Sequence, residues 1–295
     1  MSHAKQYYLE TSSIRKVGGN LQQVGAIDEC RTSAFVLFEL LTGLRENHDE
    51  YSQRKPAIAA VLDSGIAIEW SLPMSRLKQA YKKLQYHRDD ESTLRPIIDS
   101  ARESSSSGHF VDLMNERQLM HSLEELERKD NDLAEALRVI AEHDSFRHGA
   151  DAFFAERPPG ATEDEKERIY RQTRRWMDSY CLIALDAVVD GIAYKCAVEC
   201  IGEPTQEELE EISKSYDGSV RVFMKAFSYA LVQYQARTVT PGKNDLADLL
   251  HLVYLRDGDV LVSEEGRNKA VAQATKAAGI PVQCIASLSR TAGAR

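Results

Sequence analysis

Both ends of the chain show short apolar segments that alternate with helical periodicity. Near the N-terminus, aromatic and aliphatic residues predict short strands over 6–9, 28–32 and 66–70. The intervening segments carry apolar residues at helical spacing together with capping residues. They predict helices over 14–21, 34–43, 49–62 and 74–84.

The predicted helix 34–43 differs from its neighbours because it is apolar nearly all round, which indicates burial. Ser33 is a suitable N-cap and Gly43 a suitable C-terminal stop. Glu39 is the one charged residue in this helix. Burying a carboxylate is unfavourable unless it is paired or bound to a metal ion, so Glu39 is a candidate functional-site residue.

Between residues 87 and 238 the pattern predicts helices and no strand. Capping boxes formed by Thr162 with Glu165 and by Thr205 with Glu208 mark two helix starts, and 104–108 predicts a flexible break. The predicted helices cover 111–127, 132–143, 163–201 and 205–237. Strands and helices alternate again near the C-terminus, over 245–255, 259–263, 264–278 and 280–285.

This distribution predicts an α/β protein whose two terminal pieces form one parallel sheet, because each piece is too small for a sheet of its own. The predicted core consists of 5–86 and 240–287, and 87–239 is an α-helical insertion. Strand 6–9 is expected at the centre of the sheet with 259–262 beside it. The insertion is expected to pack over the end of the sheet that carries acidic residues.

Composition and net charge narrow the classes of function that the chain could have. The 295 residues carry a formal net charge of -9, which counts against non-specific coating of nucleic acid but not against an acidic metal site. No segment is long and apolar enough to cross a membrane. The five cysteines are few and odd in number, which favours a reduced, cytoplasmic compartment.

Several carboxylates lie at or near the ends of predicted buried elements. Glu10 follows the first strand directly, and Glu265 follows strand 259–262 after Ser263 and one spacer. Asp245 and Asp248 lie in the first turn of the helix that precedes this strand. Reactive groups gather at the carboxyl ends of parallel strands, so Glu10 and Glu265 should meet there. Such a carboxylate cluster suits a hard cation, Mg²⁺ or Mn²⁺.

Four ordered motifs resemble those of PIN-domain nucleases. Residues 7–12 (YYLETS) are similar to that family's opening strand, acid and hydroxyl, and 32–43 (TSAFVLFELLTG) to its second motif. Residues 244–251 (NDLADLLH) resemble its third motif, an acid at a helix start, and 260–265 (VLVSEE) its fourth. The resemblance covers about 5–85 and 241–287 and excludes the helical segment.

The resemblance implies a metal-dependent ribonuclease in which four acidic residues are catalytic and bind Mg²⁺ or Mn²⁺: Glu10, Glu39, Asp248 and Glu265. Asp245 is a further candidate ligand, but Asp248 is preferred because His251 follows it on the same helix face. Thr11 and Ser263 are expected to orient site carboxylates or to cap helices. The implied partners are an RNA substrate, an inhibitor or partner protein, and a second copy of the chain in a homodimer.

Two features leave alternatives open. The family usually has Asp where this chain has Glu10 and Glu265, so a catalytically degenerate PIN-like module that binds RNA or protein is the second hypothesis. A purely helical interaction protein is the third, and it would require the strands to be misassigned. Single residues also have ordinary interpretations: Glu39 could pair with a buried arginine, and His251 is more often a packed helix residue than a base. Glu10 could accept backbone N–H groups, and Asp245 could interact with the helix dipole. Glu264 could be an exposed acid in the first turn of its helix. Five basic residues could be solvated instead of binding phosphate: Arg171, Arg174, Arg175, Arg267 and Lys269.

Overall fold

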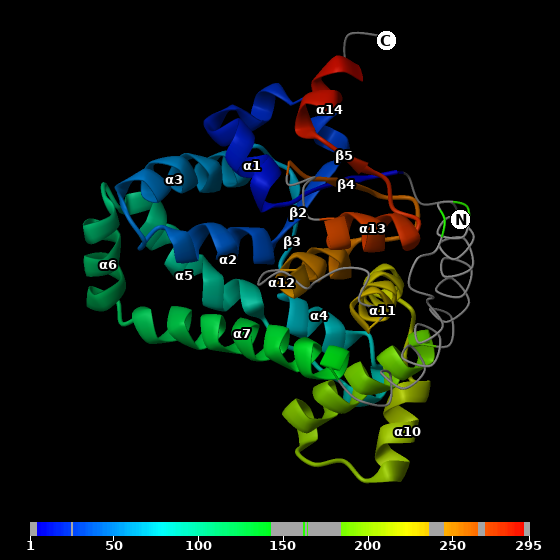
Figure 1. The fold of residues 1–295 in the computed structure, drawn as a ribbon. Helices are drawn as coiled ribbons and strands as arrows, with labels where there is room; N and C mark the ends of the chain where they lie inside the picture. The colour runs from blue at the N-terminus through cyan, green and yellow to red at the C-terminus, as the bar shows by residue number, and fades with distance from the viewer. Residues whose placement is uncertain are drawn as a thin grey trace.

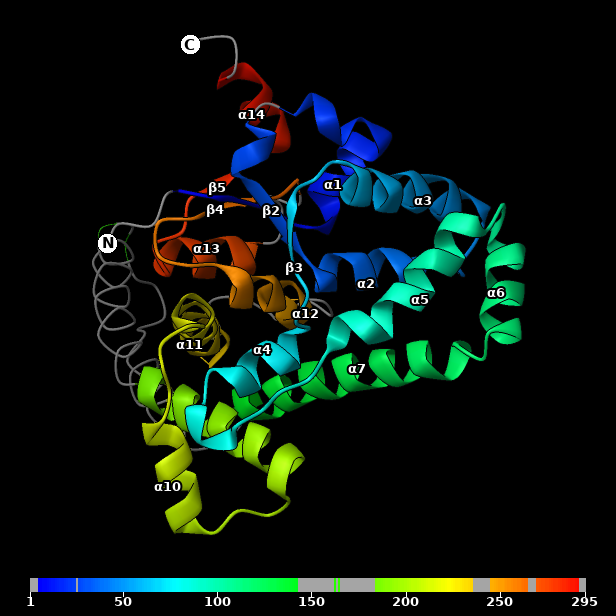
Figure 2. The same cartoon turned by 180° about the vertical axis from the view of Figure 1, so that it is seen from behind.

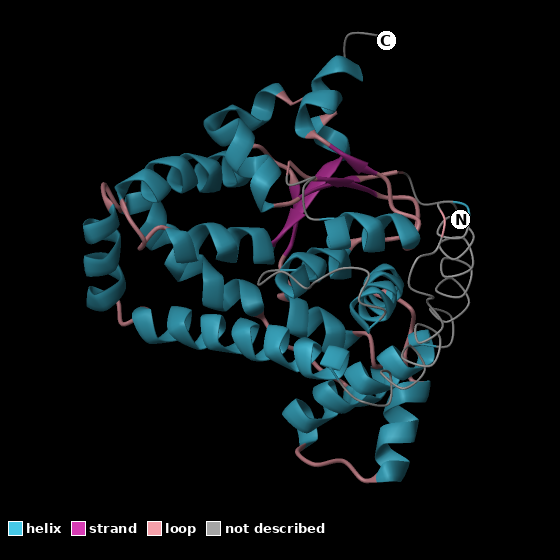
Figure 3. Ribbon diagram, in the orientation of Figure 1, coloured by secondary structure: helices cyan, strands magenta, loops and turns pink. Residues whose placement is uncertain are grey.

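The computed structural model describes residues 5–24, 26–142, 162, 164, 184–235, 245–264 and 269–291. It is an α/β protein with a five-stranded sheet in the order β3-β2-β1-β4-β5, in which every pair is parallel. Figure 3 shows the strands gathered in one small sheet surrounded by helices. The strands are β1 (Tyr7–Leu9), β2 (Cys30–Ser33), β3 (Ala67–Glu69), β4 (Val260–Val262) and β5 (Val282–Gln283).

The two ends of the chain build this sheet together, as predicted. Strand β1 is central, and Tyr7 pairs with Cys30 of β2 on one side and with Val260 of β4 on the other. The sequence pattern was sufficient here because each strand is a short apolar run bounded by helix caps or turns. The purely helical hypothesis is wrong, since a parallel sheet lies at the centre of the structure (Figure 3).

The connections place helices on both faces of the sheet. The chain runs from β1 through β2 to β3 in one direction and from β4 to β5 in the other, so right-handed crossovers put the two sets of helices on opposite faces. Figures 1 and 2 show α1 and α3 grouped on one side, and α11, α12 and α13 on the other. The first set comprises α1 (Thr11–Val17), 3-10 segments at Gly18–Gln23 and Ile27–Glu29, α2 (Ala34–Gly43) and α3 (His48–Asp63). The second comprises α11 (Arg221–Gln235), α12 (Asp245–Leu250), a 3-10 turn at His251–Tyr254 and α13 (Lys269–Ala277). Helix α14 (Ile285–Thr291) follows β5 and lies on the side of α1 (Figures 1 and 2).

The described part of 87–239 contains helices and no strand, and an isolated bridge joins Tyr216 in this segment to Tyr81 before it. The long helix α7 runs past α2, α5 and α12 (Figures 1 and 2). It is continuous where the sequence pattern predicted two helices, and the predicted helix 205–237 is instead two helices separated by a turn at Gly218, whose φ is +78°. The elements are α4 (Pro73–Gln79), a 3-10 turn (Lys82–Leu84), α5 (Asp90–Glu103), α6 (Ser107–Glu116), α7 (Met120–Glu142), a helix over 184–201, and α10 (Gln206–Lys214).

Two predicted boundaries differ from the structure for local reasons. The predicted flexible break at 104–108 is a tight turn in which Ser106 accepts the backbone N–H of His109 and so caps α6. The capping box of Thr205 and Glu208 is present at the start of α10. The other predicted box lies outside the described residues, because Glu165 is not among them. Within the described ranges, no helix is both long and apolar enough to span a membrane.

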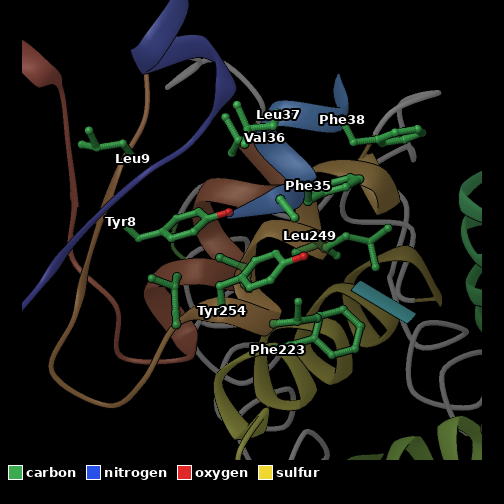
Figure 4. Packing of buried hydrophobic residues seen from close by; sticks show 14 of the residues in the cluster. Tyr8, Leu9, Phe35, Val36, Leu37, Phe38, Phe223, Leu249 and Tyr254 are labelled. Carbon is green, nitrogen blue, oxygen red and sulfur yellow. The ribbon is translucent and has the colours of Figure 1, made fainter. Parts of the chain in front are cut away.

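The hydrophobic core is continuous from the sheet into the helices of the 87–239 segment. Tyr8 of β1 is fully buried, and its ring stacks on that of Tyr254 at a centroid distance of 5.7 Å (Figure 4). A buried ion pair between Arg31 of β2 and Asp259, which precedes β4, lies beside this stack. The aromatic stack and the ion pair therefore tie together strands from opposite ends of the chain.

Gly43 has a role that the sequence did not indicate. It is the last residue of α2, as predicted, and Leu44 follows in a helical conformation. A side chain at this position would overlap Arg54, since a Cβ on Gly43 would lie 2.1 Å from the Arg54 Cζ. Arg54 donates to the backbone oxygen of Glu39 at 2.6 Å and pairs with Glu50.

We expect Gly43→Ala to destabilise the protein by about 1–3 kcal/mol, because overpacking would push Arg54 out of these contacts. Gly108→Ala is the matched control, since a Cβ there meets nothing closer than 4.0 Å and alanine favours a helix. Urea unfolding measures both. Equal midpoints for Gly43→Ala and the wild type would contradict the steric role of Gly43.

Candidate functional site

The carboxyl ends of β1 and β4 lie side by side where the direction of the sheet connections reverses. Such a switch point forms a crevice outside the strand ends and is the usual ligand site of open parallel sheets. Glu10 follows β1 there, is 8% exposed, and donates its backbone N–H to Val262 at the end of β4. The expected acidic residue is therefore at the expected edge of the sheet.

Hydroxyl groups from the first turn of α1 organise this edge. Ser12 donates to Glu10 Oε1 and accepts the backbone N–H of Glu264. Ser13 donates to the carbonyl of Val262 at 2.7 Å, and Thr11 donates to Glu39 Oε2. The Thr-Ser-Ser sequence thus links β1, α2 and the end of β4. Thr11 contacts a site carboxylate, as expected from the motif.

Glu39 projects from the buried helix α2 to the same region. Its Oε2 lies 3.1 Å from the Nε2 of His251 and also accepts the hydroxyl of Thr11. Burial alone would raise the pKa of Glu39, but the imidazolium and the two hydrogen bonds outweigh it and hold the pKa below its usual value. The buried partner of Glu39 is therefore a histidine. Arg54, the nearby arginine, contacts the backbone carbonyl of Glu39 and contributes only charge at longer range.

His251 is 4% exposed and lies among the site acids. Burial alone would lower its pKa, but the charge and hydrogen bond of Glu39, with smaller contributions from Glu10 and Asp248, raise the pKa to about 9. Its other nitrogen, Nδ1, lies 3.2 Å from the hydroxyl of Tyr8. As an imidazolium, His251 donates from both nitrogens. His251 is thus packed in the core, as the sequence interpretation held, and it also pairs with Glu39.

The Tyr8 hydroxyl extends the hydrogen-bonded chain into the core. It lies 2.7 Å from the hydroxyl of Ser33, the residue that precedes α2. The Tyr8 hydroxyl can donate one hydrogen bond and accept another, so it joins His251 to Ser33. The ring of Phe35 contacts the His251 ring at a centroid distance of 4.9 Å. These buried contacts fix the imidazole in one orientation toward Glu39.

The two aspartates of α12 have different surroundings. Asp245 is 3% exposed and accepts the hydroxyl of Tyr234 at 3.2 Å, which ties α12 to α11. Asp248 is half-buried, and its charge contributes to the raised pKa of His251. The proximity of His251 to Asp248 agrees with the spacing that favoured Asp248.

Residues beyond β4 have structural contacts or lie outside the described part of the chain. Glu264 was expected to be an exposed helix acid, but its Oε1 accepts the backbone N–H of Ile285 at the start of α14 at 2.7 Å. Ser263 donates its backbone N–H to Gln283 of β5. Glu265 and Arg267 lie outside the described residues, as does the side chain of Lys269. The predicted basic residues Arg171, Arg174 and Arg175 also lie outside them.

Asp130 on α7 is a further acid near the site that the sequence interpretation missed. It lines a cavity of about 430 Å³ together with Glu39, Phe38 and Arg45. Burial and the nearby charge of Glu39 raise the pKa of Asp130 to about 7. A signal was present in the sequence: Asp130 interrupts the apolar stripe of Leu126 and Leu133, where an amphipathic helix should carry an apolar residue.

The carboxylates match a hard divalent cation in chemistry. In the described part of the structure, Glu10 Oε2 and Glu39 Oε1 have no hydrogen-bond partner, so each residue keeps an oxygen available for an ion. Within the same residues, no group of three or more His, Cys, Asp or Glu side chains is already placed to hold a metal. Glu10, Glu39 and Asp248 would hold the ion together with Glu265.

Fold and site together define a parallel α/β protein with a buried acidic cluster at the switch point of its sheet. Comparisons with protein-family models, curated proteins and solved structures found no match to this chain.

Proposed function

We propose that the protein is a metal-dependent ribonuclease of PIN type that hydrolyses RNA phosphodiester bonds at the switch point. The observation that supports it most is the placement of Glu10 and Glu39 against the hydroxyls of Ser12 and Thr11, with His251 3.1 Å from Glu39. Asp248 also contributes to the raised pKa of His251, and these residues come from elements that are widely separated in the sequence. Burying neighbouring carboxylates is unfavourable, and a bound cation would offset this cost.

The residues of the chain would act by binding and orientation. Thr11 and Ser12 fix Glu39 and Glu10, and His251 holds a proton on Nε2 against Glu39. A divalent cation, when bound, would lower the pKa of a coordinated water and offset charge on the phosphodiester. Residues of α7, including Asp130, line the cavity beside Glu39. Helix α7 would therefore limit access to the site and favour a flexible single strand as the substrate.

A second candidate is supported by one specific observation. Glu39 Oε2 is already engaged by His251 and Thr11, so the acid is neutralised without a metal. This arrangement would suit a PIN-like module that has lost catalysis and binds RNA or a partner protein.

Cleavage assays separate the two candidates. We expect the wild type to cleave single-stranded RNA in Mn²⁺ more strongly than in Mg²⁺, because Mg²⁺ requires nearly ideal octahedral geometry. EDTA should abolish cleavage. Absence of cleavage in either ion, with a folded protein, would favour the binding module.

The unusual glutamates give a sharper prediction. Ser12 holds the long side chain of Glu10, and the backbone of Glu10 is anchored to β4, so shortening the side chain should leave a gap. We expect Glu10→Asp to weaken Mn²⁺ binding and Mn²⁺-dependent cleavage by at least about tenfold, the scale of a disturbed metal environment. Calorimetric titration with Mn²⁺ and RNA cleavage measure the two effects.

Glu265→Asp and the double variant complete the comparison. If the site is adapted to glutamate, neither variant should cleave RNA faster than the wild type in Mg²⁺. A double variant clearly more active than the wild type would instead mean that the glutamates mark decay of a site built for aspartate.

A further inference from the structure

A second cavity, of about 480 Å³, lies between α2, α4, α7 and the helix over 184–201. We name it the α4–α7 pocket and define it by Phe38, Met74, Lys78, Asp90, Asp130 and Lys195. Its volume is in the range of pockets that enclose small organic ligands. The motifs and the acidic site do not account for it.

One wall of the pocket is apolar and adjoins the acidic site. Phe35 and Phe38 of α2 stack at a centroid distance of 6.3 Å, and Leu126 of α7 lines the same cavity. The Phe35 ring also contacts His251, so one side chain separates the pocket from the acidic site. Asp130 lines both this pocket and the cavity that contains Glu39. A ligand in the pocket would therefore lie next to whatever occupies the acidic site.

Two lysines that line the pocket leave a local surplus of positive charge. The ammonium groups of Lys78 and Lys195 lie 2.9 and 3.1 Å from the carboxylate of Glu199, so two cations share one acid. Lys78 is 7% exposed. Burial alone would lower its pKa, but Glu199 outweighs this effect and the pKa is raised. Lys78 is thus a buried permanent cation, and an anion beside it would complete the charge balance.

The pocket also holds a buried acceptor. Asp90 is 2% exposed, and its Oδ2 accepts the backbone N–H of Leu72 at 2.8 Å. Its Oδ1 lies 3.1 Å from the Nε of Arg88 but has no hydrogen bond of good geometry within the described structure. Buried oxygens normally accept at least one hydrogen bond, so a ligand N–H could satisfy this one.

We propose that the α4–α7 pocket binds a nucleotide, with the phosphate at Lys78 and Lys195 and the base against the wall of Phe35 and Phe38. Base N–H groups would face Asp90 and Asp130. Aromatic faces accept any base, whereas the paired ammonium groups select the phosphate. The nucleotide is either one unit of an RNA strand that continues into the acidic site, which rests on the proposed function, or a free nucleotide.

Calorimetric titration in EDTA tests the proposal, because EDTA prevents cleavage. The ligands are the four nucleoside 5′-monophosphates and a short single-stranded RNA. Lys195→Ala should weaken nucleotide binding about tenfold through loss of a charge-assisted contact. Met74→Trp, which fills the pocket without changing charge, should abolish it. The matched control is Lys214→Ala, since Lys214 pairs with Glu210 on α10 as Lys195 pairs with Glu199, but lies outside the pocket.

The ligands distinguish the source of the nucleotide. RNA that binds more tightly than any monophosphate, and that both pocket variants weaken, supports a substrate subsite. Monophosphate binding without RNA competition supports a free nucleotide. The proposal is overturned if no ligand binds the folded wild type at millimolar concentration, or if Lys195→Ala binds as well as Lys214→Ala.

The two proposals fail separately. Nucleotide binding that depends on the pocket, in a wild type that cleaves no RNA, retains the pocket and removes the nuclease. Metal-dependent cleavage by a wild type that binds none of the nucleotides or RNA in the pocket, with an unchanged KM in both pocket variants, retains the nuclease and removes the pocket. Circular dichroism melts check that Met74→Trp folds, and Lys195→Ala, whose side chain is 26% exposed, provides the test if it does not.

Discussion

Replacement of Asp248 by Asn should reduce metal-dependent cleavage of single-stranded RNA by on the order of a thousandfold or more, with the fold intact. The variant keeps the shape of the side chain but removes the charge that a hard cation requires, and several kcal/mol of charge stabilisation depend on that ion. Asp248 is half-buried on α12, and its charge contributes to the raised pKa of His251. Initial cleavage rates in Mn²⁺ and Mg²⁺ measure the loss.

Two control variants make this result specific. Asp245→Asn should retain most of the cleavage activity, because the Asn carbonyl can still accept the hydroxyl of Tyr234. Asp112→Asn removes the same charge from an exposed position on α6 and should have no effect. Equal cleavage by Asp248→Asn and the wild type would exclude the acidic site. Loss in Asp245→Asn alone would exchange the roles of the two aspartates.

The second large effect concerns the stability that His251 gives to the fold. In EDTA at pH 7.5, His251→Gln should lower the free energy of unfolding by on the order of 3 kcal/mol, because it removes a buried cation from Glu39. The pKa of His251 is about 9 in the folded protein, above its usual value of 6.5. A group whose pKa is raised by folding stabilises fully below the unfolded pKa and loses this contribution as pH rises through the folded pKa.

The wild type should therefore lose stability between pH 7.5 and 9.5 more steeply than His251→Gln. This window lies above the pKa of about 7 of Asp130, so that neighbour has already titrated. Buried thiols such as Cys30, whose pKa burial raises to about 12, contribute the same slope to both proteins and cancel in the comparison. Urea unfolding at three pH values measures how the free energy of unfolding of each protein changes with pH. Parallel curves for the two proteins would show that His251 is not charged in the folded state.

The sheet could be predicted from the sequence because its signals are local. Helix α2 begins after Ser33 and ends at Gly43 as predicted, since an apolar run with a cap admits few alternatives. Helix α7 was divided at Arg128–Asp132 because that stretch is highly polar. In the structure most of its charged residues pair within one turn, as Arg128 does with Asp132, so the polar face does not interrupt the helix.

The composition of the site was harder to predict, because its contacts join residues far apart in the chain. Glu10 and Asp248 followed from their place at the ends of elements. The partner of Glu39 did not, since neither periodicity nor spacing links it to His251 across the sheet. Asp130 was missed for a different reason: the polar side chain in an apolar stripe was visible, but its neighbour on α2 was not.

The position of β4 beside β1 has a consequence for how the protein is made. A ribosome releases the N-terminal part first, so β1, β2 and β3 are complete long before β4 is synthesised. Until then β1 is an edge strand with unpaired backbone groups, which are prone to pair with other chains. The nascent chain also lacks Asp248 and His251, and thus half of its acidic site. The acidic site is therefore completed only late in synthesis, and the growing chain depends on early cover for the open edge of β1.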